Sequence, residues 1–355
     1  MAKEDKSNEA LLQRIVNLDA EIASLHGEVN DMHSALELKG YNSRNTKDIF
    51  GRVFPVPVDV EHKALGLHIL KCGNPQPRAF HASWFGFFVT FFSTFAAAPL
   101  GPTLKESKDL GGLGLTPKEW AAGNMASVSG TIIFRLITGT ICDKLGARRG
   151  LAFLLFGTVP ALIGIIFVQD AAGFIVCRCI IGCSLASFVA CQVWCTQQFS
   201  KSTVGLANAT AGGWGNLGGG MTNLLMPLIY DGILAGTGDD KDGTNRAWRL
   251  CFLVPLGLHV IAGLFVLTGR DLPDGNFKEL ETSGAKQKSD VKVVLKVGAS
   301  NINAWILTIT YGFCFGVELT ITNVAALYFY EYHGAPARAP PKPAGRHAQH
   351  AAHAA

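Results

Sequence analysis

Three charged side chains, Arg135, Arg178 and Glu318, stand inside apolar stretches of the sequence. Holding a guanidinium in the middle of such a stretch costs about 3 kcal/mol or more if the stretch crosses a membrane, so Arg135 should face a cavity or a partner. A guanidinium presents paired N–H donors in one plane, and this fork suits small planar anions. The residues alone leave two interpretations of Arg135 open: an anion ligand, or one half of a structural ion pair.

A glycine-rich segment, A-G-G-W-G-N-L-G-G-G, occupies residues 211–220. Glycine is a poor helix former, so helix propensity does not explain this density. Small residues that recur at every fourth position would let a neighbouring backbone approach closely. We expect these glycines to form a packing and gating surface: Gly212, Gly213, Gly215, Gly218 and Gly219. Packing does not explain Asn216, whose amide could hydrogen-bond an anion or a neighbouring backbone.

A charged turn, G-T-I-C-D-K-L-G-A-R-R, separates two apolar stretches. It places an acid at a helix end, a glycine at the turn and two bases before the next helix. Such charges can hold neighbouring helices together by ion pairs, and the glycine keeps the turn tight. The residues predicted to form this latch are Gly139, Asp143, Gly146, Arg148 and Arg149. A turn that only carries positive charge on the cytoplasmic side is the alternative.

The elements that position these residues are predicted to be membrane-spanning helices. Of the 355 residues, 48% are hydrophobic and 16% are charged, a balance that indicates a membrane protein. Seven stretches approach the length needed to cross a bilayer, at about 84–100, 119–142, 150–168, 172–199, 203–230, 248–269 and 301–330. Lys and Arg gather in the loops after the second, fourth and sixth stretches, which predicts a cytoplasmic N-terminus.

Other classes of function find no support in the composition. The net charge is only +4 and the bases are spread over loops and tail, so no nucleic-acid partner is expected. Most of the nine Cys residues lie in apolar stretches and are expected to pack as small hydrophobic side chains. No spacing predicts a metal site or a cofactor. No Ser/His/Asp or Cys/His arrangement indicates an enzyme.

The remaining segments differ in character. Residues 1–40 carry apolar side chains at heptad spacing between 11 and 36, which predicts a cytoplasmic helix for self-association or a partner helix. A helix on the membrane surface is the alternative. The predicted order is then as follows: a cytoplasmic linker at 41–81, a six-helix half at 82–269, a cytoplasmic loop at 270–300, a seventh helix at 301–330 and a disordered Ala/Pro/His tail at 331–355.

Several motifs stand in a characteristic order: S-T-F-A-A-A-P-L (93–100), S-V-S-G-T-I-I-F-R-L (127–136), C-D-K-L-G-A-R-R-G (142–150), the glycine-rich segment, D-L-P-D-G-N (271–276) and Y-G-F-C-F-G-V-E-L (311–319). In order and spacing they resemble the nitrate/nitrite porter family of the major facilitator superfamily, especially its plant and algal high-affinity nitrate transporters. The likeness runs from about Phe54 to Tyr330. It implies an all-α polytopic fold, with the N-terminal six-helix half and about one helix of the second half present in this chain.

The resemblance also implies roles for individual residues. Arg135 matches an anion-binding arginine of the family, and Phe188 and Tyr311 match aromatic residues that sandwich the anion. Aromatic packing in the core is the alternative for these two rings. Arg178 opens R-C-I-I-G, similar to a motif linked to proton coupling, although the fourth residue departs from it. Independently of the resemblance, Glu318 is a carboxyl within the seventh stretch that could carry a proton or pair with an arginine elsewhere. The family's activity is secondary active nitrate uptake, here expected to be proton-driven and at the plasma membrane, often with a single-span accessory protein.

Three questions stay open at this point. Nitrite or another small anion could replace nitrate as the substrate. A membrane protein that regulates or dimerises without transporting is the alternative function. Because the likeness ends near Tyr330, where the composition changes abruptly, the sequence is expected to be a fragment or a mispredicted gene end, with a natural truncated isoform as the alternative.

Overall fold

The computed structural model describes residues 47–282 and 291–333, together with seven isolated positions between residues 14 and 28. Apart from those positions and residues 331–333, the predicted heptad helix (1–40) and tail (331–355) lie outside the described residues. The described residues form helices, and their only β-structure is three isolated bridges, each with at least one partner between Lys47 and Ala64.

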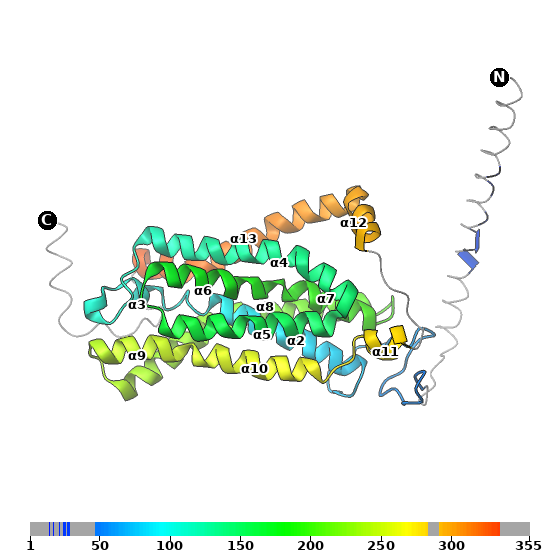
Figure 1. Cartoon of the computed structure of the whole chain (residues 1–355), viewed down its shortest axis with the longest axis horizontal. Coiled ribbons are helices and arrows are strands. Elements are labelled where there is room, and N and C mark those ends of the chain that lie inside the picture. Colours follow the sequence, from blue (N-terminus) through cyan, green and yellow to red (C-terminus); the bar gives the residue numbers. More distant parts are fainter. Residues whose placement is uncertain are drawn as a thin grey trace, which may run out of the picture.

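Seven long helical segments of the described chain lie roughly parallel in one bundle (Figure 1). They are α2 (Gln76–Phe95), α4 (Pro117–Leu145), α5 (Ala147–Phe167), α6 (Ala171–Cys183) continued by η2 (Ser184–Ala186) and α7 (Ser187–Gln198), α8 (Val204–Thr237), α9 (Lys241–Cys251) followed by α10 (Leu253–Leu267), and α13 (Ile302–His333). Shorter helices join them: α3 (Gly101–Lys105), η1 (Lys108–Leu110), α11 (Phe277–Thr282) and α12 (Val291–Ser300). Each long segment overlaps one predicted span, so the all-α polytopic fold is confirmed.

Five of these segments are long and apolar enough to cross a membrane: Pro117–Leu145, Ala147–Phe167, Ala171–Gln198, Lys241–Leu267 and Ile302–Ala325. The other two, α2 and α8, were also predicted as spans but are less apolar. Polar residues open α2, and glycine, Asn and Thr dilute α8. Burial gives the physical reason for α2, because 15 of its 20 residues are buried against protein. A helix surrounded by other helices needs no continuous apolar face toward lipid.

The boundary of the first helix differs from the prediction. α2 begins at Gln76, inside the segment expected to be linker up to residue 81, and ends at Phe95 rather than near residue 100. The described part of that linker, residues 47–75, lies at the same end of the bundle as α11 (Figure 1). Backbone hydrogen bonds tie it there, from Ala64 N to Gln198 O (2.9 Å) and from Ser200 N to Ala64 O (3.0 Å). Residues 47–75 are therefore part of the packed structure.

The centre of the bundle is α2, which packs against α8, α7 and α10. Its phenylalanines contribute to the buried apolar clusters, with Phe92 in one and Phe87, Phe91 and Phe95 in another. α13 lies at the periphery and is mostly exposed. It meets the bundle through Phe315 and Leu319, which are buried in the second cluster. Residues of the candidate site therefore come from both the central and the peripheral helices.

Candidate functional site

Arg135 of α4 lies among three aromatic rings. Its Cζ atom is 4.4 Å from the ring centroid of Phe315, 5.6 Å from that of Phe188 and 5.7 Å from that of Tyr311. These rings come from α7 and α13, so three helices build the cluster. A guanidinium within about 6 Å of a ring face is attracted by the ring electrons. The structure thus brings together the three residues that the resemblance assigns to the anion site.

The surroundings of the Arg135 nitrogen atoms bear on the two interpretations of this residue. Its Nε and Nη2 are buried and have no hydrogen-bond partner among the described residues. No carboxylate forms an ion pair with Arg135 in the described part of the chain. Buried donors are normally satisfied, so these two need an explanation. A positively charged fork with unpaired donors between aromatic walls fits a small planar anion better than a structural ion pair.

The aromatic walls do not stand apart as a sandwich would require. Phe188 and Tyr311 stack on each other, with centroids 5.8 Å apart and planes 10° apart. A flat anion in contact with a ring on each side needs about 7 Å between the rings, because each contact takes about 3.5 Å or more. The two rings must therefore separate, or slide, before an anion can lie between them.

Phe315 was missed from the sequence, although it is the ring closest to Arg135. It stacks on Tyr311 with centroids 5.2 Å apart and is 7% exposed. The signal was present, because Phe315 follows Tyr311 by four residues and so shares its helix face. Phe87 is a further residue behind the site, with its ring 5.2 Å from that of Phe188.

The glycines of α8 explain how Phe87 reaches this place. A Cβ atom on Gly215 would lie 1.9 Å from Cδ1 of Phe87, and one on Gly218 would lie 2.3 Å from the carbonyl oxygen of Phe88. Neither position can hold a side chain without displacing α2. Close approach between α8 and α2 therefore depends on these two glycines.

The other predicted glycines differ in their surroundings. Cβ atoms on Gly212 and Gly219 would make ordinary contacts, at 3.5 Å from Nε2 of Gln192 and 3.4 Å from Cδ1 of Phe91. A Cβ on Gly213 would meet nothing within 4 Å, and that residue is exposed. The structure gives Gly213 no part in the close contact of α8 with α2.

Asn216 lies one helical turn after Gly212 on α8. An added Cβ on Gly212 would be 3.7 Å from the Phe188 ring, so this face of α8 borders the ring cluster. The Oδ1 atom of Asn216 is buried and has no hydrogen-bond partner among the described residues. The Asn216 amide therefore lies near the site with an unpaired oxygen atom.

Arg178 is the second arginine within a span, and it is 1% exposed. One Nη group donates to the carbonyl oxygen of Thr94, and the other donates to Oδ1 of Asn124 (3.0 Å) and Oδ1 of Asn323 (3.2 Å). Its Nε has no partner among the described residues. The guanidinium thus joins α2, α4 and α13 to α6 through neutral oxygen atoms. Glu318, the other proton-coupling candidate, is half-buried and has no ion pair in the described part of the chain.

The predicted latch contains an ion pair, but its acid comes from elsewhere. Arg148 donates its backbone N–H to Oδ1 of Asp271 (3.1 Å) and its Nη1 to the carbonyl oxygen of Leu267 (2.9 Å), while its Nε lies 3.6 Å from Oδ2 of Asp271. Gly146 has φ +91°, and a Cβ there would lie 2.3 Å from Oδ1 of Asp271. Burial raises the pKa of the Asp271 carboxyl, and Arg148 opposes that shift.

Three residues predicted for the latch do not take part in this ion pair. Asp143 forms no ion pair in the described part of the chain, so Asp271 corrects the prediction for the acid. Arg149 is exposed, and a Cβ on Gly139 would meet nothing within 4 Å. Asp271 opens D-L-P-D-G-N just after the sixth span, on the same side as the latch, which is the signal that could have found it.

A charged cluster extends the latch toward the linker. The Asp48 carboxylate lies 2.5 Å from Nε of Arg52 and 3.1 Å from Nη1 of Arg270, and His62 Nδ1 lies 2.7 Å from Oδ1 of Asp274. Burial acts to raise the pKa of Asp48, but hydrogen bonds from Arg52 outweigh it and hold that pKa below its usual value. These pairs join residues 47–62 to the segment after α10.

The amino-acid sequence of the chain matches a known protein family and several known proteins. Residues 83–343 match the family described as Major Facilitator Superfamily. The chain is 41% identical over 297 residues to "High affinity nitrate transporter 2.5" of Arabidopsis thaliana, which covers 83% of this chain and 57% of that protein. It is 41% identical over 300 residues to "High-affinity nitrate transporter 2.3" of Oryza sativa subsp. japonica, covering 84% and 55%. It is 40% identical over 287 residues to "Nitrate transporter 2.2" of Chlamydomonas reinhardtii, covering 79% and 54%.

The chain spans a little over half the length of these curated relatives. Those relatives are named as transporters, which agrees with the expectation that the chain is not an enzyme. The match over residues 83–343, together with helices apolar enough to cross a membrane, establishes a multi-pass membrane protein. The chain belongs to the Major Facilitator Superfamily.

Proposed function

We propose that this chain serves secondary active uptake of nitrate, with Arg135 as the anion ligand. One observation carries the proposal: the Arg135 guanidinium lies among three aromatic rings and keeps two buried donors without a partner among the described residues. Nitrate is planar with a delocalised charge, so it can accept paired hydrogen bonds in its plane and stack against rings on its faces. The names of the relatives support nitrate as the substrate.

The stacked rings suggest how binding could be coupled to movement. Phe188 belongs to α7 and Tyr311 to α13, and their present separation leaves no room for an anion between them. An anion that enters between them would move α13 relative to α7. In an alternating-access protein, such a change at a substrate site is what links binding to the exchange of open faces.

The decisive experiment is nitrate uptake by vesicles that contain this chain, wild type or Arg135→Lys. Lysine keeps the charge but lacks the planar fork, so we expect uptake to fall to background. Arg14→Lys is the matched control, because Arg14 is exposed and lies outside both the site and the latch. Uptake equal to that of empty vesicles for the wild type would contradict transport by this chain.

A binding assay separates the alternative functions. Nitrate should raise the unfolding temperature of the purified wild type but not of Arg135→Lys. Stabilisation without uptake would favour the non-transporting membrane protein over the transporter. Equal stabilisation by nitrite would broaden the substrate to both anions.

We also propose a cytoplasmic N-terminus in the plasma membrane. The basic latch and residues 47–75 lie at the same end of the bundle, and excess Lys and Arg favour the cytoplasmic side (Figure 1). Cys72 is exposed at this end. A membrane-impermeant thiol reagent should label it only after right-side-out cells are permeabilised. Labelling of Cys72 in intact cells would reverse the orientation.

The proposal has three further parts: proton coupling, a single-span accessory protein and self-association through residues 11–36. For coupling, Glu318 is the stronger candidate, because its carboxyl has no ion pair among the described residues while Arg178 is held by neutral oxygens. Glu318→Gln should make uptake insensitive to an imposed pH gradient. Unchanged sensitivity of uptake to the pH gradient would exclude Glu318.

Cross-linking of the full chain in membranes, with and without residues 1–40, tests association with the accessory protein and self-association.

A further inference from the structure

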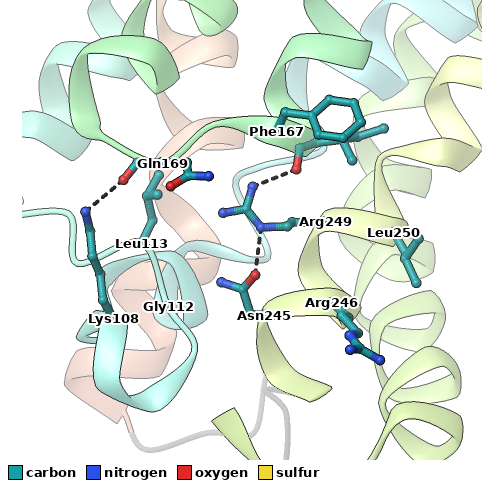
Figure 2. A pocket seen from close by; sticks show the side chains of 10 residues that line it. Lys108, Gly112, Leu113, Phe167, Gln169, Asn245, Arg246, Arg249 and Leu250 are labelled. Atoms are coloured by element: carbon teal, nitrogen blue, oxygen red, sulfur yellow. Dashed lines mark hydrogen bonds between the residues drawn. The ribbon is translucent and has the colours of Figure 1, made fainter. Parts of the chain in front are cut away.

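A pocket with basic walls lies at the opposite end of the bundle from residues 47–75. It has a volume of about 530 Å³ and lies between the 108–113 segment, the end of α5 and helix α9. Figure 2 shows the Arg249 guanidinium in the middle of this pocket, near Asn245 and Phe167, with Lys108 and Gln169 across from it. Its size is within the range of small-molecule sites.

The lining of the pocket is positively charged. It contains Lys108, Arg246 and Arg249, and no Asp or Glu. Two nearby acids are directed to other groups: Asp109 lies 3.9 Å from Nζ of Lys241, and Asp170 accepts a hydrogen bond from the Gly173 backbone. Asp240 and Asp242 at the start of α9 lie outside the lining, so the charged side chains of the lining itself are all basic.

Arg249 is held in position by the protein. Its Nε donates to Oδ1 of Asn245 (2.8 Å), its Nη1 donates to the carbonyl oxygen of Ile166 (2.6 Å), and its Cζ lies 4.3 Å from the Trp248 ring centroid. Neither bond uses Nη2. Lys108 is oriented by a hydrogen bond to the carbonyl oxygen of Gln169 (2.8 Å), which leaves further ammonium donors for a ligand. A positioned guanidinium and an ammonium group can together bind a phosphate group.

The edges of the pocket are apolar and face outward. Phe167 is 71% exposed and Leu250 is 37% exposed, and both belong to segments apolar enough to cross a membrane. The lining residues share no helix with Arg135, Phe188 or Tyr311, so the pocket is separate from the proposed nitrate site. An anion bound here would have hydrocarbon surface beside it.

We propose that this pocket binds the phosphate of an anionic phospholipid in the leaflet opposite the proposed cytoplasmic side, with the acyl chains along Phe167 and Leu250. Lys108 and Arg249 hold the phosphate oxygens, and the exposed Arg246 adds charge at the rim. The shared chemistry also fits free inorganic phosphate. The outward apolar rim favours the lipid, because a soluble anion gains nothing from it.

The test uses the full chain purified in a neutral detergent and titrated with phosphatidylglycerol, phosphatidylcholine of the same chain length, or inorganic phosphate. Binding is read by native mass spectrometry and by the shift in unfolding temperature. We expect phosphatidylglycerol to bind more tightly than the other two. Lys108→Gln with Arg246→Gln should weaken it, by about fivefold for each charge removed.

Lys118→Gln is the matched control, because Lys118 is an exposed base at the same end of the bundle but does not line the pocket. Arg246→Gln alone should leave the fold intact, because this side chain is exposed and makes no buried contact. Weaker binding of phosphatidylglycerol by this variant is therefore not explained by misfolding. Equal losses for the control and the pocket variants would overturn the proposal, and so would equal binding of phosphatidylcholine. Inorganic phosphate binding as tightly as the lipid would overturn the assignment to a lipid. None of these readouts involves nitrate, so the proposed transport function is not affected by their outcome.

Discussion

Arg135 and Arg178 are the same residue type in neighbouring helices, yet their surroundings differ. Arg178 is fully buried and gives both Nη groups to neutral oxygens on three other helices. Arg135 is half-buried, meets three rings and leaves Nε and Nη2 without a partner among the described residues. Nε has no partner among the described residues in either arginine, so the Nη groups make the difference: protein oxygens hold both of them in Arg178, and Nη2 of Arg135 has no described partner. The position of the two arginines inside apolar segments does not reveal this difference.

The largest expected effect is on stability. Arg178→Leu should lower the free energy of unfolding by about 3 kcal/mol or more, because it leaves two buried acceptors and one partly buried acceptor unpaired at about 1 kcal/mol or more each. Arg135→Leu breaks no hydrogen bond of Nε or Nη2 to a described residue and loses mainly the contacts with three rings, so it should change stability by less than half as much. Unfolding of both variants in detergent measures the difference. A larger loss for Arg135→Leu would reverse the comparison.

Ligand-dependent stability is expected to be the next largest effect. Nitrate at a hundred times its dissociation constant should stabilise the wild type by about 2.7 kcal/mol. It should not stabilise Arg135→Lys, whose point charge cannot reproduce the planar fork. Calorimetry at increasing nitrate, with chloride added to keep ionic strength constant, measures this. Stabilisation of the variant equal to that of the wild type would remove Arg135 from the site.

Packing behind the rings gives a smaller effect. Gly215→Ala forces a methyl group against Phe87, which supports Phe188, and should cost about 2 kcal/mol. Gly213→Ala is the matched control, because its Cβ would meet nothing within 4 Å. Comparison of their unfolding temperatures and nitrate affinities is the measurement. If the two variants had the same unfolding temperature and the same nitrate affinity, the close contact of α8 with α2 would not support the site.

The ring closest to Arg135 should contribute modestly to binding. Phe315→Leu removes a cation–π contact worth about 1 kcal/mol, so nitrate affinity should fall about fivefold. Phe313→Leu tests the same substitution at a side chain that is 76% exposed on the same helix. Isothermal titration of both variants would show whether the effect is local. An equal change in both would point to a general loosening of α13.

The smallest effect concerns the paired charges at the end of the bundle. The pKa of Asp48 is lower in the folded protein, so its contribution to stability is present above the unfolded value near 3.8 and is lost as pH falls through the folded pKa. Asp48→Asn should therefore make stability less dependent on pH in this acidic range. Unfolding midpoints between about pH 5 and 3 test this. The same slope in both proteins would exclude the contribution.

Local signals in the sequence predicted the features that depend on one segment. Arg135 stood out as a charge in an apolar stretch, and the helices could be placed from hydropathy. The partners could not be predicted in this way. Asn323 is 145 residues from Arg178, and Asp271 is 123 residues from Arg148, so only packing of the whole bundle brings them together. Phe315 was the avoidable omission, because its spacing from Tyr311 already placed both rings on one face.

The short η2 turn between α6 and α7 has a consequence for both arginines. A 3₁₀ turn advances about 120° per residue and an α-helix about 100°, so rewinding its three residues as α-helix would rotate α7 by about 60° relative to α6. It would also shorten the segment by about 1.5 Å. Arg178 precedes this turn and Phe188 follows it. A change of helical pitch in η2 would rotate the Phe188 ring away from Arg135 and leave the hydrogen bonds of Arg178 in place.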